Sequence, residues 1–313
     1  MKSVSSLSDF YYKNLFPTLQ KLEQEREHLK HRIIIVGIIF TTLLLLVGFT
    51  LKNYYEFILV AYIVIGTIIY KFLLHDYTYE FKTGVIKPLV QAIDKTLLYS
   101  MDSHIGEYLF EHSKLFSTPD KISGNDYVKG SIDGVNIEFS DLHAQKREKN
   151  SKRQESWSTI FKGLFIVADF NKHFYAQTVV LPDSAQNIFG DIIGHWMQSI
   201  NTAREELVKM DDPEFEKEFV VYSTNQVEAR YILSNSLMKK LLTFKEKSKQ
   251  QVHISFVGTH IYMAISYNKD LFEPSIFHSL LDYKIAMEYV KTLHLAIGVV
   301  EELKLNQKLW SKT

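Results

Sequence analysis

The chain has 313 residues, more than one average domain, so its length predicts about two structural units. Lys and Arg together number 36, as do Asp and Glu, and this balance gives no global charge that would indicate binding to nucleic acid. Cysteine is absent, which excludes disulfide bonds, thiolate nucleophiles and cysteine-based metal or iron–sulfur sites and is compatible with a reducing compartment.

The first 32 residues carry apolar side chains at helical spacing, among them Leu15, Leu19 and Leu22. Pro17 is suited to the first turn of a helix. We therefore expect residues 1–32 to form a cytosolic amphipathic helical arm that continues into the next segment. Its apolar stripe is expected to lie on lipid headgroups or on another helix, and a simple spacer is the alternative.

Two apolar runs follow, and they predict a transmembrane helical hairpin over residues 33–74. Residues 33–51 are 19 consecutive uncharged residues, of which 14 are Ile, Leu, Val or Phe. Such a composition favours insertion into a bilayer by roughly 4 to 8 kcal/mol. Residues 54–74 carry only Glu56 and Lys71, both near an end, where charged side chains reach the interface.

Basic residues flank both outer ends of this hairpin, whereas Lys52 is alone in its turn. The positive-inside rule then predicts that both termini are cytoplasmic, at the bacterial inner membrane. A cleaved signal peptide is a weaker alternative because about 32 mostly polar residues precede the first run. Two buried helices of a soluble core are another alternative, although helices that are apolar all round need protein on every side.

The remaining chain predicts a juxtamembrane helical segment over residues 75–118 and a cytosolic α+β domain over residues 119–313. Val85, Leu89 and Ile93 recur at four-residue steps and indicate the helix. The fold class is thus α+β, a transmembrane helical hairpin followed by β-hairpins and packed helices. We expect three antiparallel hairpins, over residues 127–139 around Asp133-Gly134, 160–181 around Asn171-Lys172 and 252–267 around Gly258-Thr259.

Further elements are expected between and after these hairpins. Residues 144–157 lack apolar periodicity and predict a mobile loop. Apolar spacing predicts a helix over residues 184–210 that Asp212-Pro213 closes, a strand at 219–222, a helix carrying Leu237 to Leu242, and a final helix over 274–305.

Five runs of this sequence resemble a known family. They are FKGLFIVADFNKH (161–173), TVVLPD (178–183), DPEFEKEFVVY (212–222), QVEARY (226–231) and LFEPS (271–275). They are similar to the bacterial membrane family catalogued as domain of unknown function 3137. The likeness is expected to span nearly the whole chain, including Phe16-Pro17 and the hairpin. It implies an architecture and no activity, so it assigns no catalytic residue.

Four side chains form a candidate site for a divalent metal. Asp141 and His143 lie two apart at the end of a predicted strand, and Asp169 and His173 flank the following turn. Carboxylate and imidazole groups are common metal ligands. The alternative is that they make turn hydrogen bonds, because no recognised ligand spacing such as HExxH is present.

A second candidate site is the predicted loop at residues 144–157, which we expect to face lipid. Its five basic residues outnumber the acidic Glu148 and Glu155 by three. Near an anionic leaflet each basic residue contributes about 1 kcal/mol of attraction. A disordered solvent loop is the alternative. The basic residues are Lys146, Arg147, Lys149, Lys152 and Arg153.

These features predict a membrane-anchored binding or scaffold module with no cofactor. Its expected partners are membrane lipid and a protein at the cytoplasmic face, with oligomerisation open and nucleic acid excluded. One alternative is a membrane-tethered, metal-dependent enzyme that uses the Asp and His groups, although no Gly-x-Ser-x-Gly or phosphate-loop motif is present. The other is an oligomeric transport or channel subunit, which the lack of a polar stripe in the apolar runs disfavours.

Overall fold

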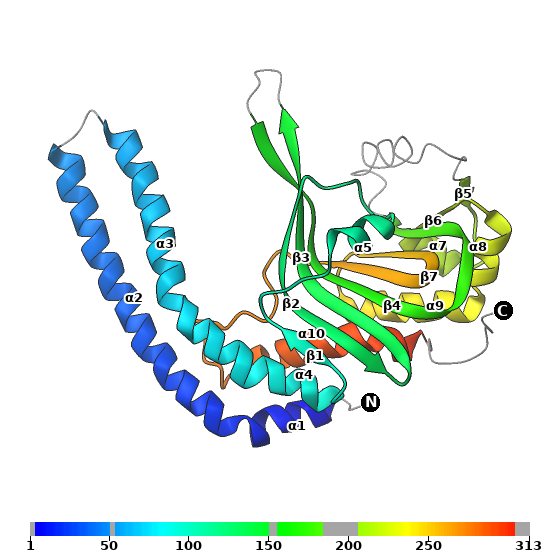
Figure 1. Ribbon diagram of the computed structural model, residues 1–313, viewed down its shortest axis with the longest axis horizontal. Helices are drawn as coiled ribbons and strands as arrows, with labels where there is room; N and C mark the ends of the chain where they lie inside the picture. Colours follow the sequence, from blue (N-terminus) through cyan, green and yellow to red (C-terminus); the bar gives the residue numbers. More distant parts are fainter. Residues whose placement is uncertain (1–3, 51–53, 150–154, 184–205, 304–313) are drawn as a thin grey trace. The chain divides into compact units, whose positions relative to one another are not determined.

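The structure, a computed structural model, describes residues 4–50, 54–149, 155–183 and 206–303. The chain divides into two compact units. The first is Met1–Ile93 together with Phe272–Lys291, and the second is Asp94–Leu271 together with Thr292–Thr313. Long apolar helices at the N-terminus and an antiparallel sheet with helices confirm the predicted α+β class (Figure 1).

The first unit begins with a short helix and two long ones. They are α1 (Val4–Asn14), α2 (Phe16–Thr50) and α3 (Tyr55–Phe81), followed by a π-helical segment η2 (Lys82–Ile86) and by α4 (Lys87–Ile93). Residues 16–32 thus continue into the first apolar run as one helix, α2, whereas residues 4–14 form the separate helix α1. The predicted turn at Lys52 lies outside the described residues.

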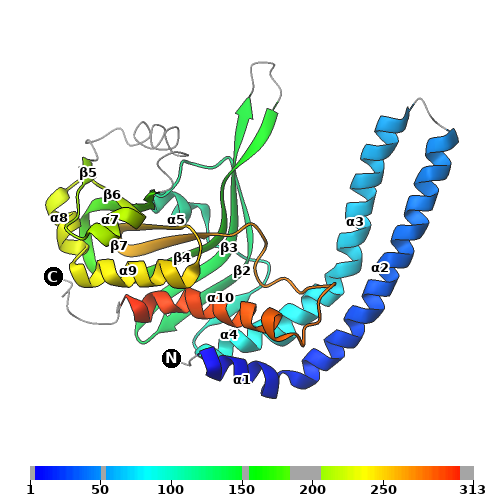
Figure 2. The ribbon, with the colours of Figure 1, turned by 180° about the vertical axis from the view of Figure 1, so that it is seen from behind.

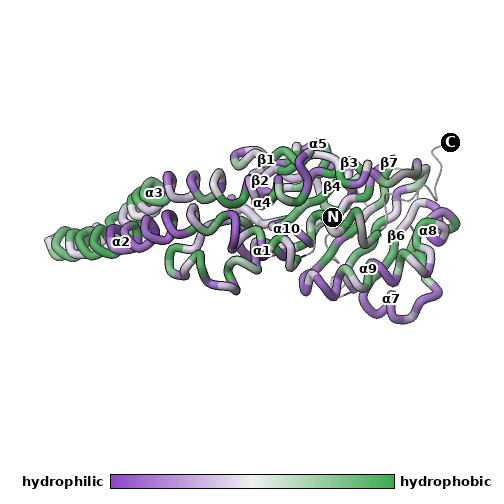
Figure 3. The backbone as a smooth tube through the Cα atoms, turned by 90° about the horizontal axis from the view of Figure 1, so that it is seen from below, coloured by the Kyte–Doolittle hydropathy of each residue, from purple (hydrophilic) through white to green (hydrophobic). Residues whose placement is uncertain are grey.

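Two stretches, Phe16–Thr50 and Glu56–Ile93, are helical, long enough and apolar enough to cross a membrane. Their most apolar windows are entirely unburied. Figure 3 shows hydrophobic colour along the outer parts of α2 and α3.

The apolar stripe predicted in residues 1–32 is buried by protein. Leu15, Leu19 and Leu22 are at most 6% exposed. The backbone of η2 at Gly84 comes close to a side chain of α2, because a Cβ placed on Gly84 would lie 3.0 Å from the Cγ2 of Thr18. The stripe was expected to lie either on lipid headgroups or on another helix. In the described residues it packs against protein.

The second unit contains a sheet in which neighbouring strands are all antiparallel. Its order is β1-β2-β3-β4-β6-β5, and β7 pairs with β4 in addition (Figure 2). The described strands are β1 (Leu98–Ser100), β2 (Lys121–Ile132), β3 (Val135–Lys149), β4 (Glu155–Pro182), β5 (Glu206–Val208), β6 (Phe219–Ser223) and β7 (Val252–Ser266).

The first predicted hairpin is confirmed. β2 and β3 meet at Asp133 and Gly134, whose φ angles of 50° and 83° are those that a type I′ turn requires. The strand predicted at 219–222 is also confirmed as β6.

The other two predicted hairpins are wrong, because β4 and β7 are each one continuous strand. The two strands pair with each other on both sides of the positions predicted as turns. Asp169 pairs with His260 and Thr178 pairs with Phe256. Thr178 is nine positions after Asp169 in β4, whereas Phe256 and His260 are only four positions apart in β7. The extra residues form a bulge, which bends the paired strands where turns were expected.

The predicted mobile loop at residues 144–157 is wrong for its described part. Residues 144–149 belong to β3 and residues 155–157 to β4, and the two stretches pair, with Arg147 opposite Trp157 and Lys149 opposite Glu155. Residues 150–154 lie outside the described residues. Cross-strand pairing therefore orders a segment whose lack of apolar periodicity indicated a loop.

The juxtamembrane helix is shorter than predicted. It ends at Ile93, where the Asp94 side chain accepts hydrogen bonds from the backbone N–H and hydroxyl of Thr96, both at 2.8 Å, and turns the chain. β1 and the short helix α5 (Glu107–His112) occupy the rest of the segment predicted as helical.

The last third of the chain also differs at its helix boundaries. Residues 184–205 of one predicted helix lie outside the described residues, and residues 206–208 form β5. Asp212 caps α7 (Pro213–Glu218) at its beginning, since its side chain accepts from the N–H groups of Glu214 and Phe215. The remaining helices are α8 (Gln226–Ile232), α9 (Asn235–Ser248) and α10 (Tyr283–Glu302), which begins nine residues later than predicted.

An aromatic core fills one face of the sheet in the second unit. Phe110 from α5 stacks on Phe116, with ring centroids 5.4 Å apart, and both lie against Phe161 of β4. Close packing on this sheet also depends on Gly163, whose φ is +143° and where a Cβ would lie 2.2 Å from the carbonyl oxygen of Ile265. The core and the β4–β7 contact thus fix the strands that form the site described next.

Candidate functional site

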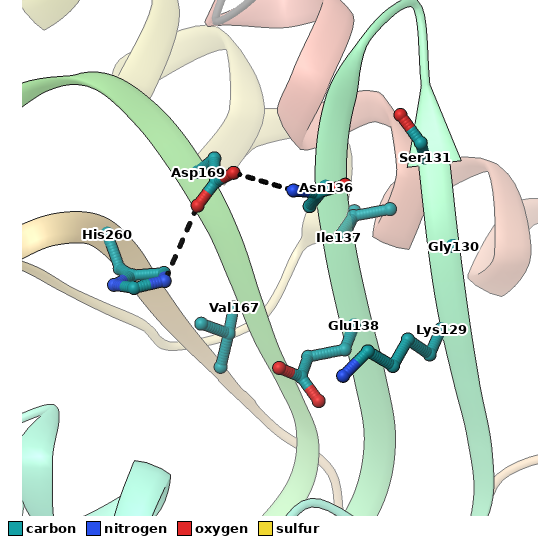
Figure 4. A pocket seen from close by; sticks show the side chains of 9 residues that line it. All are labelled: Lys129, Gly130, Ser131, Asn136, Ile137, Glu138, Val167, Asp169 and His260. Atoms are coloured by element: carbon teal, nitrogen blue, oxygen red, sulfur yellow. Dashed lines mark hydrogen bonds and ion pairs between the residues drawn. The ribbon is translucent and has the colours of Figure 1, made fainter. Parts of the chain in front are cut away.

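An open pocket of about 510 Å³ lies on the sheet of the second unit, beside the aromatic core (Figure 4). Residues from β2, β3, β4 and β7 line it, and most of its side chains are polar. They are Lys129, Gly130, Ser131, Asn136, Ile137, Glu138, Val167, Asp169 and His260. The lining residues come from four strands that pair side by side, and this antiparallel pairing brings their side chains together.

Asp169 links three strands at one end of the pocket. One carboxylate oxygen accepts a hydrogen bond of 2.9 Å from the side-chain amide of Asn136, and the other lies 3.4 Å from Nε2 of His260 (Figure 4). The other ring nitrogen of His260, Nδ1, lies 3.3 Å from the Thr259 hydroxyl. Asp169 is therefore held in place, while about 29% of its side chain and 35% of that of His260 stay exposed to a ligand.

Glu138 and Lys129 face each other at the other end, since they are register partners on β3 and β2. The hydroxyl of Tyr127 donates a 2.5 Å hydrogen bond to Glu138. Burial, and next this bond, raise the pKa of Tyr127, so the phenol stays protonated and continues to donate. The pocket thus carries one ammonium group and two carboxylates, and each carboxylate accepts a hydrogen bond from a neighbouring strand.

His112 and Tyr262 lie next to His260. Nδ1 of His112 is 2.8 Å from the Tyr262 hydroxyl, and the rings of His260 and Tyr262 have centroids 5.9 Å apart. Burial lowers the pKa of His112, with the charges of Lys114 and His260 contributing, so its neutral form is favoured. A neutral imidazole can accept from the Tyr262 hydroxyl, which supports this wall of the site.

The structure places Asp141 and His143 two residues apart on β3 and gives them separate partners. Asp141 is 4% exposed and accepts a 2.7 Å hydrogen bond from the backbone N–H of Leu271. Burial raises its pKa to about 7. Nε2 of His143 lies 2.9 Å from the Thr159 hydroxyl, and burial lowers its pKa.

The other two candidate ligands lie elsewhere on the sheet. Asp169 belongs to the pocket above, whereas Asp141 pairs with Leu164, five residues away along β4, a separation of roughly 17 Å. His173 packs edge-on against Tyr175. Among the described residues, no group of three or more His, Cys, Asp or Glu side chains is placed to hold a metal ion. A metal site at the four predicted positions therefore stays a prediction.

The predicted basic residues fall into two groups. Lys146, Arg147 and Lys149 lie on β3, whereas Lys152 and Arg153 lie outside the described residues. Arg147 forms an ion pair with Glu155 and places its guanidinium 5.9 Å above the ring of Trp157.

Sequence reasoning missed most of the pocket. Lys129, Asn136, Glu138 and His260 belong to three strands, and the first and last are 131 positions apart in the chain. No short motif connects them. Only Asp169 could be singled out from the sequence, because it is a charged residue in a mostly apolar run. Its partners in the pocket, Asn136 and His260, could not be identified in this way.

The family model described as "Protein of unknown function (DUF3137)" matches residues 159–305. The chain resembles that family over this stretch. All five sequence runs that suggested the resemblance lie within it, as do Val167, Asp169 and His260 of the pocket. The match covers a little under half of the chain. It includes neither residues 1–32 nor the two apolar helices, so the expected whole-chain likeness is not shown.

One solved structure resembles the chain weakly. It is the crystal structure of the mycobacterial trehalose monomycolate transport factor A, with 13% sequence identity and a TM-score of 0.34. The likeness covers 69% of this chain and 93% of that one. At this TM-score no property is transferable between the two proteins. No curated protein matches the chain.

Proposed function

We propose that the protein is a membrane-anchored binding module, with α2 and α3 crossing the bacterial inner membrane and both chain ends in the cytoplasm. In this proposal the polar pocket on the sheet binds a small polar molecule or the polar head of a larger one. The observation that carries the proposal is the large exposed apolar surface of the two helices, in a chain whose other unit has a polar pocket of its own.

The exposed surface has the composition that a bilayer requires. Ile38, Leu45 and Phe49 of α2 are 62%, 68% and 77% exposed, and Phe57 and Phe72 of α3 are 77% and 79% exposed. A contiguous apolar surface of this extent is disfavoured in water and stable in lipid. Anchoring accounts for it directly.

The threonine hydroxyls in the apolar runs of these helices form internal hydrogen bonds. The hydroxyls of Thr41 and Thr42 donate to the carbonyls of Gly37 and Ile38, four residues earlier, at 2.7 and 2.8 Å. Thr41 also lies 2.9 Å from the hydroxyl of Tyr62, which joins α2 to α3. Internal satisfaction of hydroxyl groups is what a hydrocarbon environment demands.

The pocket supports a binding role through its mixture of groups. Lys129 can donate to a ligand, whereas Glu138 and Asp169 can accept from it. Opposite charges in one small space favour a ligand that carries both donors and acceptors over a strongly charged one. The proposed ligand class is therefore a small polar or zwitterionic molecule.

The anchoring is checked by cysteine labelling, which needs no removal of native thiols because the chain contains none. We expect Lys52→Cys to react with a membrane-impermeant maleimide in intact bacterial cells. Glu214→Cys, an exposed position on α7, should react only after the inner membrane is permeabilised. Labelling of Glu214→Cys in intact cells, or recovery of the chain in the carbonate-soluble fraction, would contradict the proposed anchoring.

The pocket is checked by ligand-observed NMR with the full chain in detergent and a panel of amino acids, monosaccharides and small carboxylic acids. We expect Asp169→Asn to weaken binding of a hit by roughly 10-fold, because a charged hydrogen-bond partner contributes about 1.5 kcal/mol or more. Glu214→Gln, a charge-matched change outside the pocket, should leave binding unchanged. Equal affinity in both variants would place the binding elsewhere.

A further inference from the structure

A two-stranded ribbon extends from the sheet of the second unit, and we call it the arm: residues 146–149 of β3 and 155–158 of β4 (Figure 1). β2 pairs with β3 only as far as Gln145, and β7 pairs with β4 only from Gly163. Within the described part of the chain, no third strand pairs with the arm. A ribbon of two strands has little stability of its own in water, so its contacts matter.

The base of the arm is fixed by Asp120. Its side chain accepts a 2.8 Å hydrogen bond from the N–H of Arg147, and its own N–H donates to the carbonyl of Gln145 at 2.9 Å. The ion pair between Arg147 and Glu155 then joins the two strands. These contacts give the arm a defined direction where it leaves the sheet.

One face of the arm presents an aromatic side chain beside a cation. Trp157 is 50% exposed although it is the bulkiest residue of the arm, and Arg147, its register partner, lies over its ring. An indole has an apolar body and one N–H donor, which is why Trp is enriched at the boundary between acyl chains and headgroups. An exposed Trp next to an Arg fits such a boundary.

The charge of the arm is positive. It contains three basic residues, Lys146, Arg147 and Lys149, and two acidic ones, Glu148 and Glu155. Glu155 forms an ion pair with Arg147. Basic residues close to an anionic leaflet are attracted to it.

We propose that the arm docks on anionic lipid headgroups of the bilayer that anchors the chain, with Trp157 at the headgroup boundary. This inference rests on the proposed anchoring. The anchor itself favours lipid over a soluble acidic partner, since a tethered arm meets the bilayer at high effective concentration.

The test uses the full chain in nanodiscs of phosphatidylcholine, with and without phosphatidylglycerol. The other two tryptophans are replaced, Trp196→Phe and Trp310→Phe, so that Trp157 alone emits. In anionic discs we expect a blue-shifted Trp157 emission, several-fold weaker quenching by acrylamide, and quenching by lipids brominated near the headgroup. High salt should reverse these changes because it screens the attraction.

A matched pair of variants separates the arm from general charge. Lys146→Glu should return the Trp157 signal in anionic discs to that seen in neutral discs. Lys239→Glu, the same change at an exposed position on α9, should leave the signal as it was. Emission that is identical in the two kinds of disc would overturn the arm's role while leaving the anchor intact.

Two further outcomes distinguish the remaining possibilities. Failure of the chain to enter nanodiscs would overturn the proposed anchoring itself. A Trp157 shift that arises only when a soluble acidic protein is added, and not from anionic lipid, would assign the arm to a protein partner and overturn the lipid inference.

Discussion

Replacing Asp141 by Asn is expected to stabilise the protein above pH 7. The carboxyl is buried, and burial raises its pKa from 3.8 to about 7, with the nearby Asp270 and Asp126 adding to the effect. A raised pKa in the folded state means that the folded protein holds a proton that the unfolded chain releases. Asp141 therefore adds stability below about pH 4, and this stability is lost as pH rises through about 7.

The variant cannot ionise, so it should lack this loss. The rise of the Asp141 pKa from 3.8 to about 7 corresponds to at most about 4 kcal/mol of unfolding free energy. The expected gain in stability is therefore large at pH 8 and small at pH 4. The Asn oxygen can still accept the hydrogen bond from Leu271 that Asp141 accepts. Thermal unfolding of the full chain in detergent, followed by circular dichroism from pH 4 to 9, measures the effect.

Asp102→Asn is the control, since it makes the same substitution at an exposed carboxyl in the turn after β1. It should change the unfolding temperature little at any pH. If Asp141→Asn instead destabilised the protein at every pH, the ionised carboxylate would be a net stabilising group through Leu271 and Lys162, and burial would not dominate its pKa.

The partner of Asp141 shows why this site was predictable only in part. The alternation of Val135, Ile137 and Phe139 was visible in the sequence, and continuing it by two residues places Asp141 on a buried face. A buried carboxyl needs a donor, and the donor is the N–H of Leu271, 130 residues away. Local spacing suggested a metal ligand because it contained no information about that distant partner.

The strands give a similar lesson. Asp133-Gly134 was predicted as a turn and is one, with both residues at positive φ. Gly258 also has positive φ, 62°, yet it lies within a continuous strand that bends opposite the bulge of β4. A glycine signals the same backbone freedom in a tight turn and in a bulge. Whether the chain reverses or bends depends on the neighbouring strand, which the local sequence does not specify.

Removing the Arg26 side chain is the second change with a large expected effect. The side chain is 4% exposed and lies within the first unit, on the part of α2 that precedes the apolar run. It donates two hydrogen bonds to the Glu23 carboxylate, at 2.8 and 3.1 Å, and one of 2.6 Å to the carbonyl of Ile276. It also contacts Glu27.

Glu23 in turn accepts a 3.0 Å hydrogen bond from the N–H of Leu280, so one ion pair connects α2 to two points of the segment 272–291. Burial alone would raise the pKa of Glu23, but the bonds from Arg26 and Leu280 outweigh it and lower that pKa. The carboxylate is therefore charged and depends on Arg26 for its neutralisation.

Arg26→Ala should consequently cost about 3 kcal/mol, the low end of the range for a broken buried ion pair, because 19% of Glu23 stays exposed. For a chain of 313 residues the unfolding temperature in detergent should fall by roughly 4 to 6 °C. Lys13→Ala removes a cation from an ion pair with Asp9 whose side chains are 75% and 69% exposed, and it should have almost no effect. Equal losses in the two variants would mean that Arg26 stabilises α2 only as a helix former. A much larger loss for Arg26→Ala would show that its ion pair holds α2 to the segment 272–291.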